Sequence, residues 1–298
     1  MAVITQHGQI PDLEETQGRS LWQDAARRLR RNRASVASMI ILATIALLAV
    51  FGPLLSPHPY DELAWDAMGV APDFERSFWF GTDTLGRDLF VRTMYGARVS
   101  LMVGIIATFV SLLIGVAYGA IAGFVGGRVD AVMMRTVDIL YSLPFLFFVI
   151  LLMVIFGRNL FLIFVAIGAI QWLTMARIVR GQTLSLKRKE FIEAAHAAGV
   201  SPMTIIRRHI APNVIGPVIV YATLTVPEVM LTESFLSFLG LGVQEPLTSW
   251  GALISDGVKN METRPWMLLF PAAFLAVTLF CLNFIGDGLR DALDPKDR

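Results

Sequence analysis

The sequence predicts an all-α integral membrane protein with six transmembrane helices. Hydrophobic residues make up 55% of the 298 positions, and charged residues make up only 16%, whereas soluble domains carry about 25% charged residues. The apolar residues also form long continuous runs instead of alternating with polar residues, which favours helices over the strands of a membrane barrel.

Six apolar runs are close to the roughly 20 residues that a helix needs to cross a bilayer. The run nearest the N-terminus follows more than thirty mostly polar residues that include "RRLRRNR". This pattern lacks the short basic start and cleavage site of a signal peptide, so we expect a retained anchor. The expected spans are 35–55, 98–124, 137–156, 160–176, 214–236 and 266–286. Only "GRN" separates the third span from the fourth, which suits a tight helical hairpin.

The lysines and arginines predict that both termini lie in the cytoplasm. With this orientation, 18 of the 25 basic residues fall in inside segments, as the positive-inside rule requires. The chain then has cytoplasmic tails at 1–34 and 287–298, a transmembrane domain at 35–286 and, within it, a long cytoplasmic loop at 177–213. The two long outer segments, 56–97 and 237–265, are rich in Gly, Pro and Trp, and loops of this length are often functional.

The sequence shows no sign of catalytic or metal chemistry. Cys281 is the single cysteine, and the four histidines lack metal-ligand spacing. "GTDTLGRD" lacks the full calcium-loop pattern, and no G-x-x-x-x-G-K-[ST] phosphate loop occurs. We therefore expect no catalytic residue, no metal and no cofactor on this chain, and the net charge of +1 gives no indication of nucleic-acid binding.

The cytoplasmic loop contains "EFIEAAHAAGVSPMTIIRRHIAPNV" at 190–214. Glutamates in its first turn suit the positive end of a short helix, and the alanines that follow favour helix formation. Gly199 can end that helix in a left-handed conformation. Ser201 and Pro202 are suited to cap and begin a second helix. The pattern predicts a helix–glycine–helix knob.

An apolar stripe follows in the second helix of the knob. Met203, Ile206 and Ile210 recur at helical spacing, and we expect Pro212 to end this helix before the fifth span. Small and apolar residues exposed to the cytoplasm usually need a partner, such as a groove that accepts a helix. A stripe of this length can equally pack on the helices of its own protein.

The loop resembles the EAA loop of ABC importer permeases. The match places Ala211 where the family commonly has leucine. The resemblance implies a coupling helix that docks in a cleft of a cytoplasmic ATPase. The candidate ATPase-coupling residues, with Ile206 added from the apolar stripe, are Glu193, Ala194, Ala195, Gly199, Ile206, Ile210 and Pro212.

Longer stretches extend the resemblance over nearly all of the chain beyond about residue 18. The segments 80–101, 233–257 and 283–298 look like the C-type permease subunit of peptide and nickel importers, and 175–195 and 18–34 look closest to the oligopeptide branch. This implies the type I ABC importer permease fold, half of a path for oligopeptides, and a bacterial inner (cytoplasmic) membrane. The implied partners are a homologous second permease, two cytoplasmic ABC ATPases that bind ATP and Mg, and a periplasmic peptide-binding protein.

Two acidic residues lie late in the fifth span. Acids at membrane depth are costly and usually face a polar cavity or a partner. Fourteen residues separate Val214 from Glu228, a rise of about 21 Å, so we expect Glu228 at depth and Glu233 nearer the outer surface. Both are candidate residues of the translocation path.

Three other functions remain open at this stage. An importer of dipeptides or nickel complexes belongs to the same class. A secondary transporter that works alone would need paired intramembrane ionisable groups and usually repeated halves, and Glu228 is the only good candidate. A membrane anchor or receptor without transport activity would leave the cytoplasmic loop unexplained.

Overall fold

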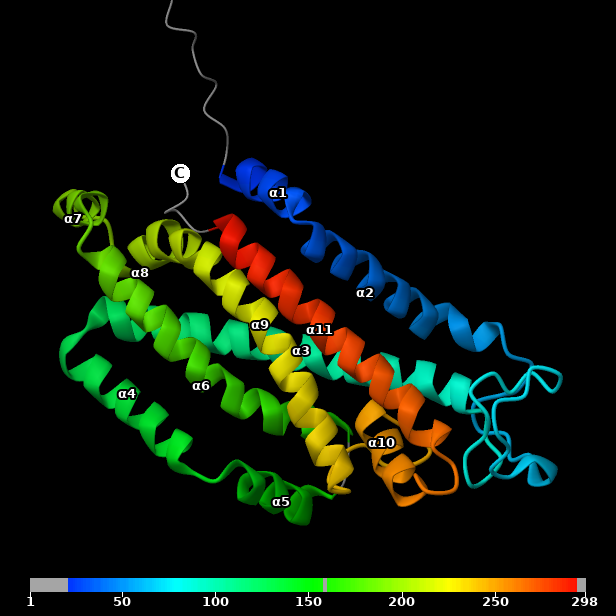
Figure 1. The fold of residues 1–298 in the computed structure, drawn as a ribbon. Helices are drawn as coiled ribbons and strands as arrows, with labels where there is room; N and C mark the ends of the chain where they lie inside the picture. The colour runs from blue at the N-terminus through cyan, green and yellow to red at the C-terminus, as the bar shows by residue number, and fades with distance from the viewer. Residues whose placement is uncertain (1–20, 158–159, 294–298) are drawn as a thin grey trace, which may run out of the picture.

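The computed structural model describes residues 21–157 and 160–293, and its elements in this part of the chain are helical (Figure 1). The ends of the two predicted tails and the centre of the predicted hairpin turn, residues 1–20, 158–159 and 294–298, lie outside the described residues. The helices are α1 (Leu21–Arg31), α2 (Arg33–Phe51), α3 (Leu89–Val125), α4 (Gly127–Ser142), α5 (Phe145–Phe156), α6 (Leu160–Lys187), α7 (Glu190–Ala197), α8 (Pro202–Ile205), α9 (Ala211–Phe238), α10 (Trp250–Lys259) and α11 (Trp266–Leu293).

The centre of the bundle is formed by α3, α6, α9 and α11. Helix α2 packs on α11 and α3, and α4 packs on α6 and α3. Helices α1, α7 and α8 and the end of α11 lie at one end of the bundle, which we call the knob end (Figure 1). The segment 52–88 and helix α10 lie toward the opposite end, which we call the loop end.

Five helical stretches are long and apolar enough to cross a membrane. They are Arg33–Leu54, Leu89–Val125, Ile163–Lys187, Pro202–Phe238 and Trp266–Leu293. Each contains or overlaps one of the expected spans. Three of them extend well beyond those spans, because α3 begins before the apolar run, α6 continues after its run, and α9 is continuous with the knob.

The prediction of one continuous helix at 137–156 is wrong. Helices α4 and α5 meet there at an angle of 82°. Leu143 is extended, with φ −72° and ψ 129°, and Pro144 precedes the first turn of α5. Proline has no backbone N–H and disfavours helical geometry in the residue before it, so Pro144 breaks the apolar run into two helices.

Helices α3 and α6 pack against each other through a glycine seam, formed by Gly115, Gly119 and Gly123 of α3. A Cβ atom added at Gly115 would lie 2.6 Å from the Met175 Cβ. One added at Gly123 would lie 2.8 Å from the Thr183 Cβ, and one added at Gly119 would overlap the backbone oxygen of Ala176. Small residues four apart let two membrane helices approach at backbone distance. The seam therefore fixes the separation of α3 and α6.

Substitution of Gly119 by alanine is expected to destabilise the chain. The added methyl group meets the α6 backbone, which cannot move as a side chain can, and overpacking of this kind costs about 1–3 kcal/mol. The Gly119→Ala chain should therefore unfold at a lower temperature in detergent than the wild type. The matched control is Gly181→Ala on α6, where nothing lies within 4 Å of the added atom. Equal melting temperatures for the two variants would contradict the role of the seam.

Candidate coupling surface and translocation cavity

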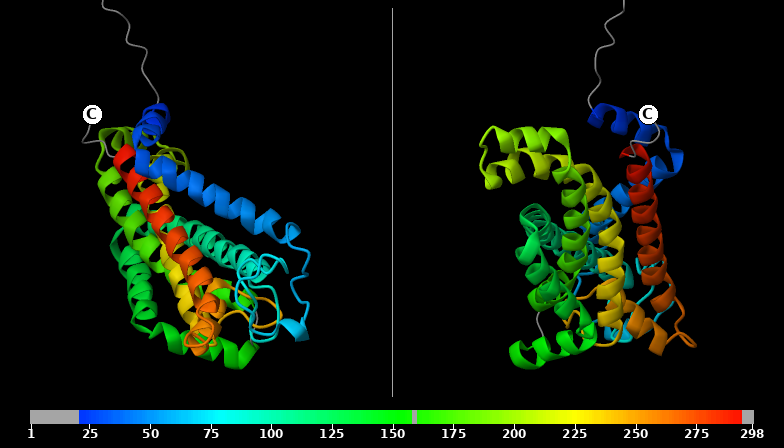
Figure 2. Two further views of the ribbon diagram at one scale, coloured as in Figure 1. Left: turned by 45° about the vertical axis from the view of Figure 1, so that its right-hand side comes forward. Right: turned by 90° about the vertical axis from the view of Figure 1, so that its left-hand side faces the viewer.

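The first helix of the knob and its glycine joint have the local structure that the sequence predicts. Helix α7 ends at Ala197, and Gly199 adopts a left-handed conformation with φ +75°. The Gly199 N–H donates to the His196 oxygen (3.0 Å), and the Val200 N–H donates to the Ala195 oxygen (3.1 Å). These bonds satisfy carbonyl groups at the helix end, as in a glycine C-cap. Helix α7 and the helix after it project beyond the bundle (Figure 2).

The expectation that Pro212 ends the second knob helix is wrong. The helix runs on from α8 through a π-helical segment, Ile206–Ile210, into α9, and Pro212 lies in the first turn of α9. The Ala211 N–H donates to the Ile206 oxygen, five residues back, and the Asn213 side chain donates to the His209 oxygen (2.6 Å). The wider π turn accommodates the proline, which cannot donate a backbone hydrogen bond.

Most of the predicted apolar stripe faces the protein itself. Ile206 and Ile210 are buried, at 9% and 0% exposure, and pack with Phe124, Val179 and Val214. Of the two alternatives for the stripe, packing on the helices of the chain itself holds for these two isoleucines, because the ends of α3, α6 and α9 bury them. Their side chains anchor the knob to the bundle.

The exposed side of the knob includes several small and apolar residues beside its charged ones. Phe191 is 43% exposed and Met203 is 55% exposed. Ala195 is half-buried and packs against the same core as the isoleucines. Of the other candidate coupling residues, Glu193, Ala194, Gly199 and Pro212 are exposed. We call Phe191, Ala194, Ala197, Ala198 and Met203 the knob face.

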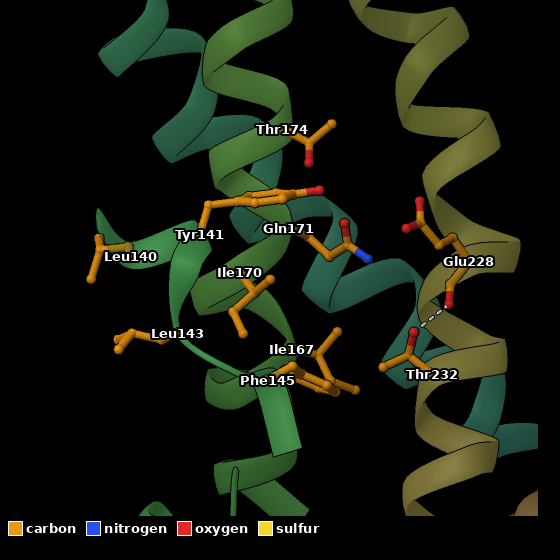
Figure 3. A pocket seen from close by; sticks show the side chains of 10 residues that line it. All are labelled: Leu140, Tyr141, Leu143, Phe145, Ile167, Ile170, Gln171, Thr174, Glu228 and Thr232. Carbon is orange, nitrogen blue, oxygen red and sulfur yellow. Dashed lines mark hydrogen bonds between the residues drawn. The ribbon is translucent and has the colours of Figure 1, made fainter. Parts of the chain in front are cut away.

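A cavity of about 320 Å³ with polar and apolar walls lies at the break between α4 and α5, where these helices face α6 and α9. Figure 3 shows the Glu228 side chain on α9 directed toward Gln171 on α6, with Tyr141 and Thr174 nearby. Apolar residues complete the wall, and the Thr232 hydroxyl donates to the Glu228 backbone oxygen (2.8 Å). The Glu228 side chain is exposed, and it forms no ion pair with any described residue.

Two ion pairs hold α4 against α6 on the knob side of this cavity. Arg180 binds both carboxylate oxygens of Asp130, at 2.5 and 2.6 Å. Arg177 donates to Asp138 at 2.8 Å, and its guanidinium lies 4.5 Å from the ring centroid of Tyr141. The two-bond Arg180–Asp130 contact defines orientation as well as distance, and it positions α4 beside α6.

Glu233 does not line the cavity, contrary to the prediction. Its carboxylate is fully buried and accepts hydrogen bonds from Ser237 (2.7 Å) and Ser100 (3.1 Å). Ser249 donates to Ser237, and the Trp250 N–H donates to Ser100, so the cluster joins α9 to α3 and α10. Glu228 and Glu233 are five positions apart on α9, a rotation of one full turn plus about 140°. The two side chains therefore project from different faces of the helix.

A largely buried ionic network at the loop end joins the segments 56–97 and 237–265. Arg87 donates to Asp83 (2.6 Å) and to Glu245 (2.9 Å), and Arg92 lies 3.5 Å from Asp83. Burial alone would lower the pKa of Arg87, but the neighbouring Asp83 carboxylate raises the pKa above its ordinary value. The sequence contains no signal for this network, because Arg87 and Glu245 are 158 positions apart.

A bundle of long apolar helices that carries a partly polar cavity and a projecting helical knob suits a transport permease. The family model described as "Binding-protein-dependent transport system inner membrane component" matches residues 115–298. The model described as "N-terminal TM domain of oligopeptide transport permease C" matches residues 20–72. The chain belongs to this family of binding-protein-dependent membrane permeases.

Relatives of known name cover almost the whole chain. The oligopeptide transport system permease protein OppC of Haemophilus influenzae is 61% identical over 293 residues, covering 97% of this chain and 94% of the relative. OppC of Escherichia coli K12 is 64% identical over 284 residues, covering 95% and 94%. The dipeptide transport system permease protein DppC of Bacillus subtilis is 46% identical, covering 98% and 96%.

The fold is also that of a solved ABC transporter. A chain of the inward-facing MetNI methionine ABC transporter superimposes with a TM-score of 0.57 at 19% identity, covering 68% of this chain and 96% of that chain. At this identity the likeness concerns the fold alone. It confirms the predicted all-α importer permease architecture.

Substitution of the two glutamates of α9 should have different effects on stability. Glu233→Ala removes the acceptor of buried hydroxyl groups, which costs about 1–3 kcal/mol, and should lower the melting temperature of the purified chain. Glu228→Ala removes an exposed side chain without an ion-pair partner and should leave the melting temperature nearly unchanged. Glu233→Gln, which keeps one carbonyl acceptor, should lie between them. A larger loss of stability in Glu228→Ala than in Glu233→Ala would contradict these assignments.

Proposed function

We propose that this chain is a permease subunit of an ATP-driven oligopeptide importer and forms half of the translocation path. The OppC relatives, at 61% and 64% identity over nearly the whole chain, support the substrate class. The observation that carries the mechanism is the exposed knob, which is joined through continuous helices to the cavity. A binding surface at the end of such helices suits a subunit that is driven by another protein.

The two helices next to the knob are also two walls of the cavity. Helix α6 carries Gln171 and Thr174 in the cavity and ends at Lys187, directly before α7. The helical stretch 202–238 begins in the knob and carries Glu228. The connection from α6 to the knob is short, and the connection from the knob to α9 is unbroken. A displacement of the knob therefore moves two cavity walls together. Closure of an ATPase pair against the knob face would thereby open or close the path.

The proposed assembly contains a homologous second permease, two ABC ATPases and a periplasmic peptide-binding protein. ATP and Mg would bind to the ATPases, and this chain would need no cofactor. The distribution of lysine and arginine supports a cytoplasmic position for the knob and both termini in the inner membrane. The outer segments at the loop end would then meet the binding protein, and the second permease would complete the path beside the cavity.

The exposed positions of the proposed coupling residues predict which substitution uncouples the ATPases. Gly199→Asp places a charge on the exposed joint of the knob and should prevent recovery of the ATPases, while the second permease is still recovered. The measurement is a detergent pull-down of the chain co-expressed with these subunits. Gly127→Asp is the matched control, since Gly127 also has a positive φ (+57°) and no neighbour within 4 Å. Equal ATPase recovery by the two variants would argue against coupling through the knob.

A dipeptide importer is the second candidate function, because DppC of Bacillus subtilis is also closely related. Competition experiments on the complete assembly in proteoliposomes distinguish the two. For an oligopeptide importer, an excess of unlabelled tri-alanine should suppress ATP-dependent uptake of labelled tetra-alanine, and di-alanine should have little effect. Efficient competition by di-alanine alone would favour the dipeptide function.

A further inference from the structure

We propose that Glu228 is the counter-ion for the amino-terminal ammonium group of a peptide that passes through the cavity. This inference rests on the proposed function, because it assigns one group of the substrate to one residue of the path. Every unmodified linear peptide has an amino terminus whatever its sequence, whereas a lysine side chain is present only in some. A fixed carboxylate that recognises the amino terminus therefore suits a permease that accepts varied sequences.

The depth of Glu228 shows that its charge needs a partner. Glu228 lies ten residues before the end of α9 at Phe238, which is a rise of about 15 Å along the helix. In the other direction it lies about 21 Å along the helix from Val214. A carboxylate at such a distance from both ends of a membrane helix is costly unless it is paired or lines a wet cavity. Glu228 is exposed on the cavity wall, beside polar side chains.

The basic residues beside the cavity are already paired. Arg177 follows the cavity-lining Thr174 by one helical turn, and it binds Asp138. Arg180 lies one turn further along α6, and it binds Asp130. Glu228 forms no ion pair within the described part of the chain. The cavity therefore presents a negative charge that these arginines do not neutralise.

Glu233 shows how this protein stabilises a carboxylate that has only a structural role. Glu233 is fully buried on the same helix, and serine hydroxyls donate to both of its oxygens. No described side chain donates a hydrogen bond to the Glu228 carboxylate. The contrast indicates that the Glu228 carboxylate is kept available for a group that is absent from the chain itself.

The residues around Glu228 suit an ammonium group. An ammonium has three N–H donors and no acceptor. The Glu228 carboxylate faces the Gln171 amide, with the hydroxyls of Tyr141 and Thr174 nearby (Figure 3), and all of these groups can accept a hydrogen bond. The cavity volume of about 320 Å³ is near the lower end of the range for small-ligand pockets, which fits one end of a peptide.

The single cysteine permits a test in which the charge at position 228 is chosen chemically. The chain with Cys281→Ser and Glu228→Cys is assembled with the second permease, the ATPases and the binding protein in proteoliposomes. It is then treated with a sulfonatoethyl, a trimethylammonioethyl or a methyl methanethiosulfonate, which leave a negative, a positive or a neutral group. The same treatments of the chain with Cys281→Ser alone control for cysteines of the other subunits.

We expect Glu228→Cys to lower tri-alanine uptake about tenfold or more, the loss typical of one charge-assisted hydrogen bond. The sulfonatoethyl reagent should restore uptake, the other two reagents should not, and Glu228→Asp should retain more uptake than Glu228→Gln. Recovery of the second permease should be unchanged in each variant.

Several results would overturn the inference. Undiminished uptake in Glu228→Cys would do so, and so would restoration of uptake by the neutral or the positive reagent. Loss of the second permease from the assembly would make Glu228 an interface residue instead. An effect on Ala-Lys-Ala but not on tri-alanine would assign the contact to a lysine side chain instead. If the Cys281→Ser chain binds the ATPases but takes up no tri-alanine, the proposed substrate is wrong and the inference fails with it.

Discussion

The close packing of α3 on α6 is the constraint on which the rest of the structure depends. Gly115, Gly119 and Gly123 bring the two backbones together, so that α6 cannot shift relative to α3 without breaking a continuous contact. Helix α3 begins beside the buried ionic network of the loop end, and α6 leads into the knob. The glycine seam therefore joins the outer segments mechanically to the surface proposed for ATPase coupling. Lipid supplies no hydrophobic force between helices, so close packing of small residues provides the attraction.

The cavity combines continuous walls with one interrupted wall. Helix α6 and the 202–238 stretch run from the knob to the cavity, and the π-helical segment lets the second of these continue through Pro212. The opposite wall is the α4–α5 pair, which Pro144 bends by 82°. Two ion pairs join α4 to α6, and α5, on the other side of the bend, also packs against α6. This arrangement keeps a polar space open within an otherwise apolar bundle, at a depth where irregular backbone is tolerated only beside protein or water.

Two glutamates on one helix show how the surroundings decide the role of a residue. Glu233 is buried among serines that satisfy its carboxylate, so that it links three helices. Glu228 projects into a cavity beside arginines that are already paired, and its charge remains available to a substrate. The desolvation of a carboxylate is costly in both places. The chain itself offsets that cost at Glu233, and we propose that a peptide offsets it at Glu228.

Much of the fold followed from the sequence alone, because the responsible signals are local. Long apolar runs require helices in a membrane, and Gly199, Ser201 and Pro202 define the joint of the knob within a few residues. The glycine seam of α3 was not predicted, because it is recognised only by its contact with the partner helix α6. Only the tertiary structure decided that Ile206 and Ile210 face the bundle, that Glu233 is buried, and that Arg87 meets Glu245. Burial and ion pairing depend on groups that are distant in the chain, and their relative positions are set by the packing of whole helices.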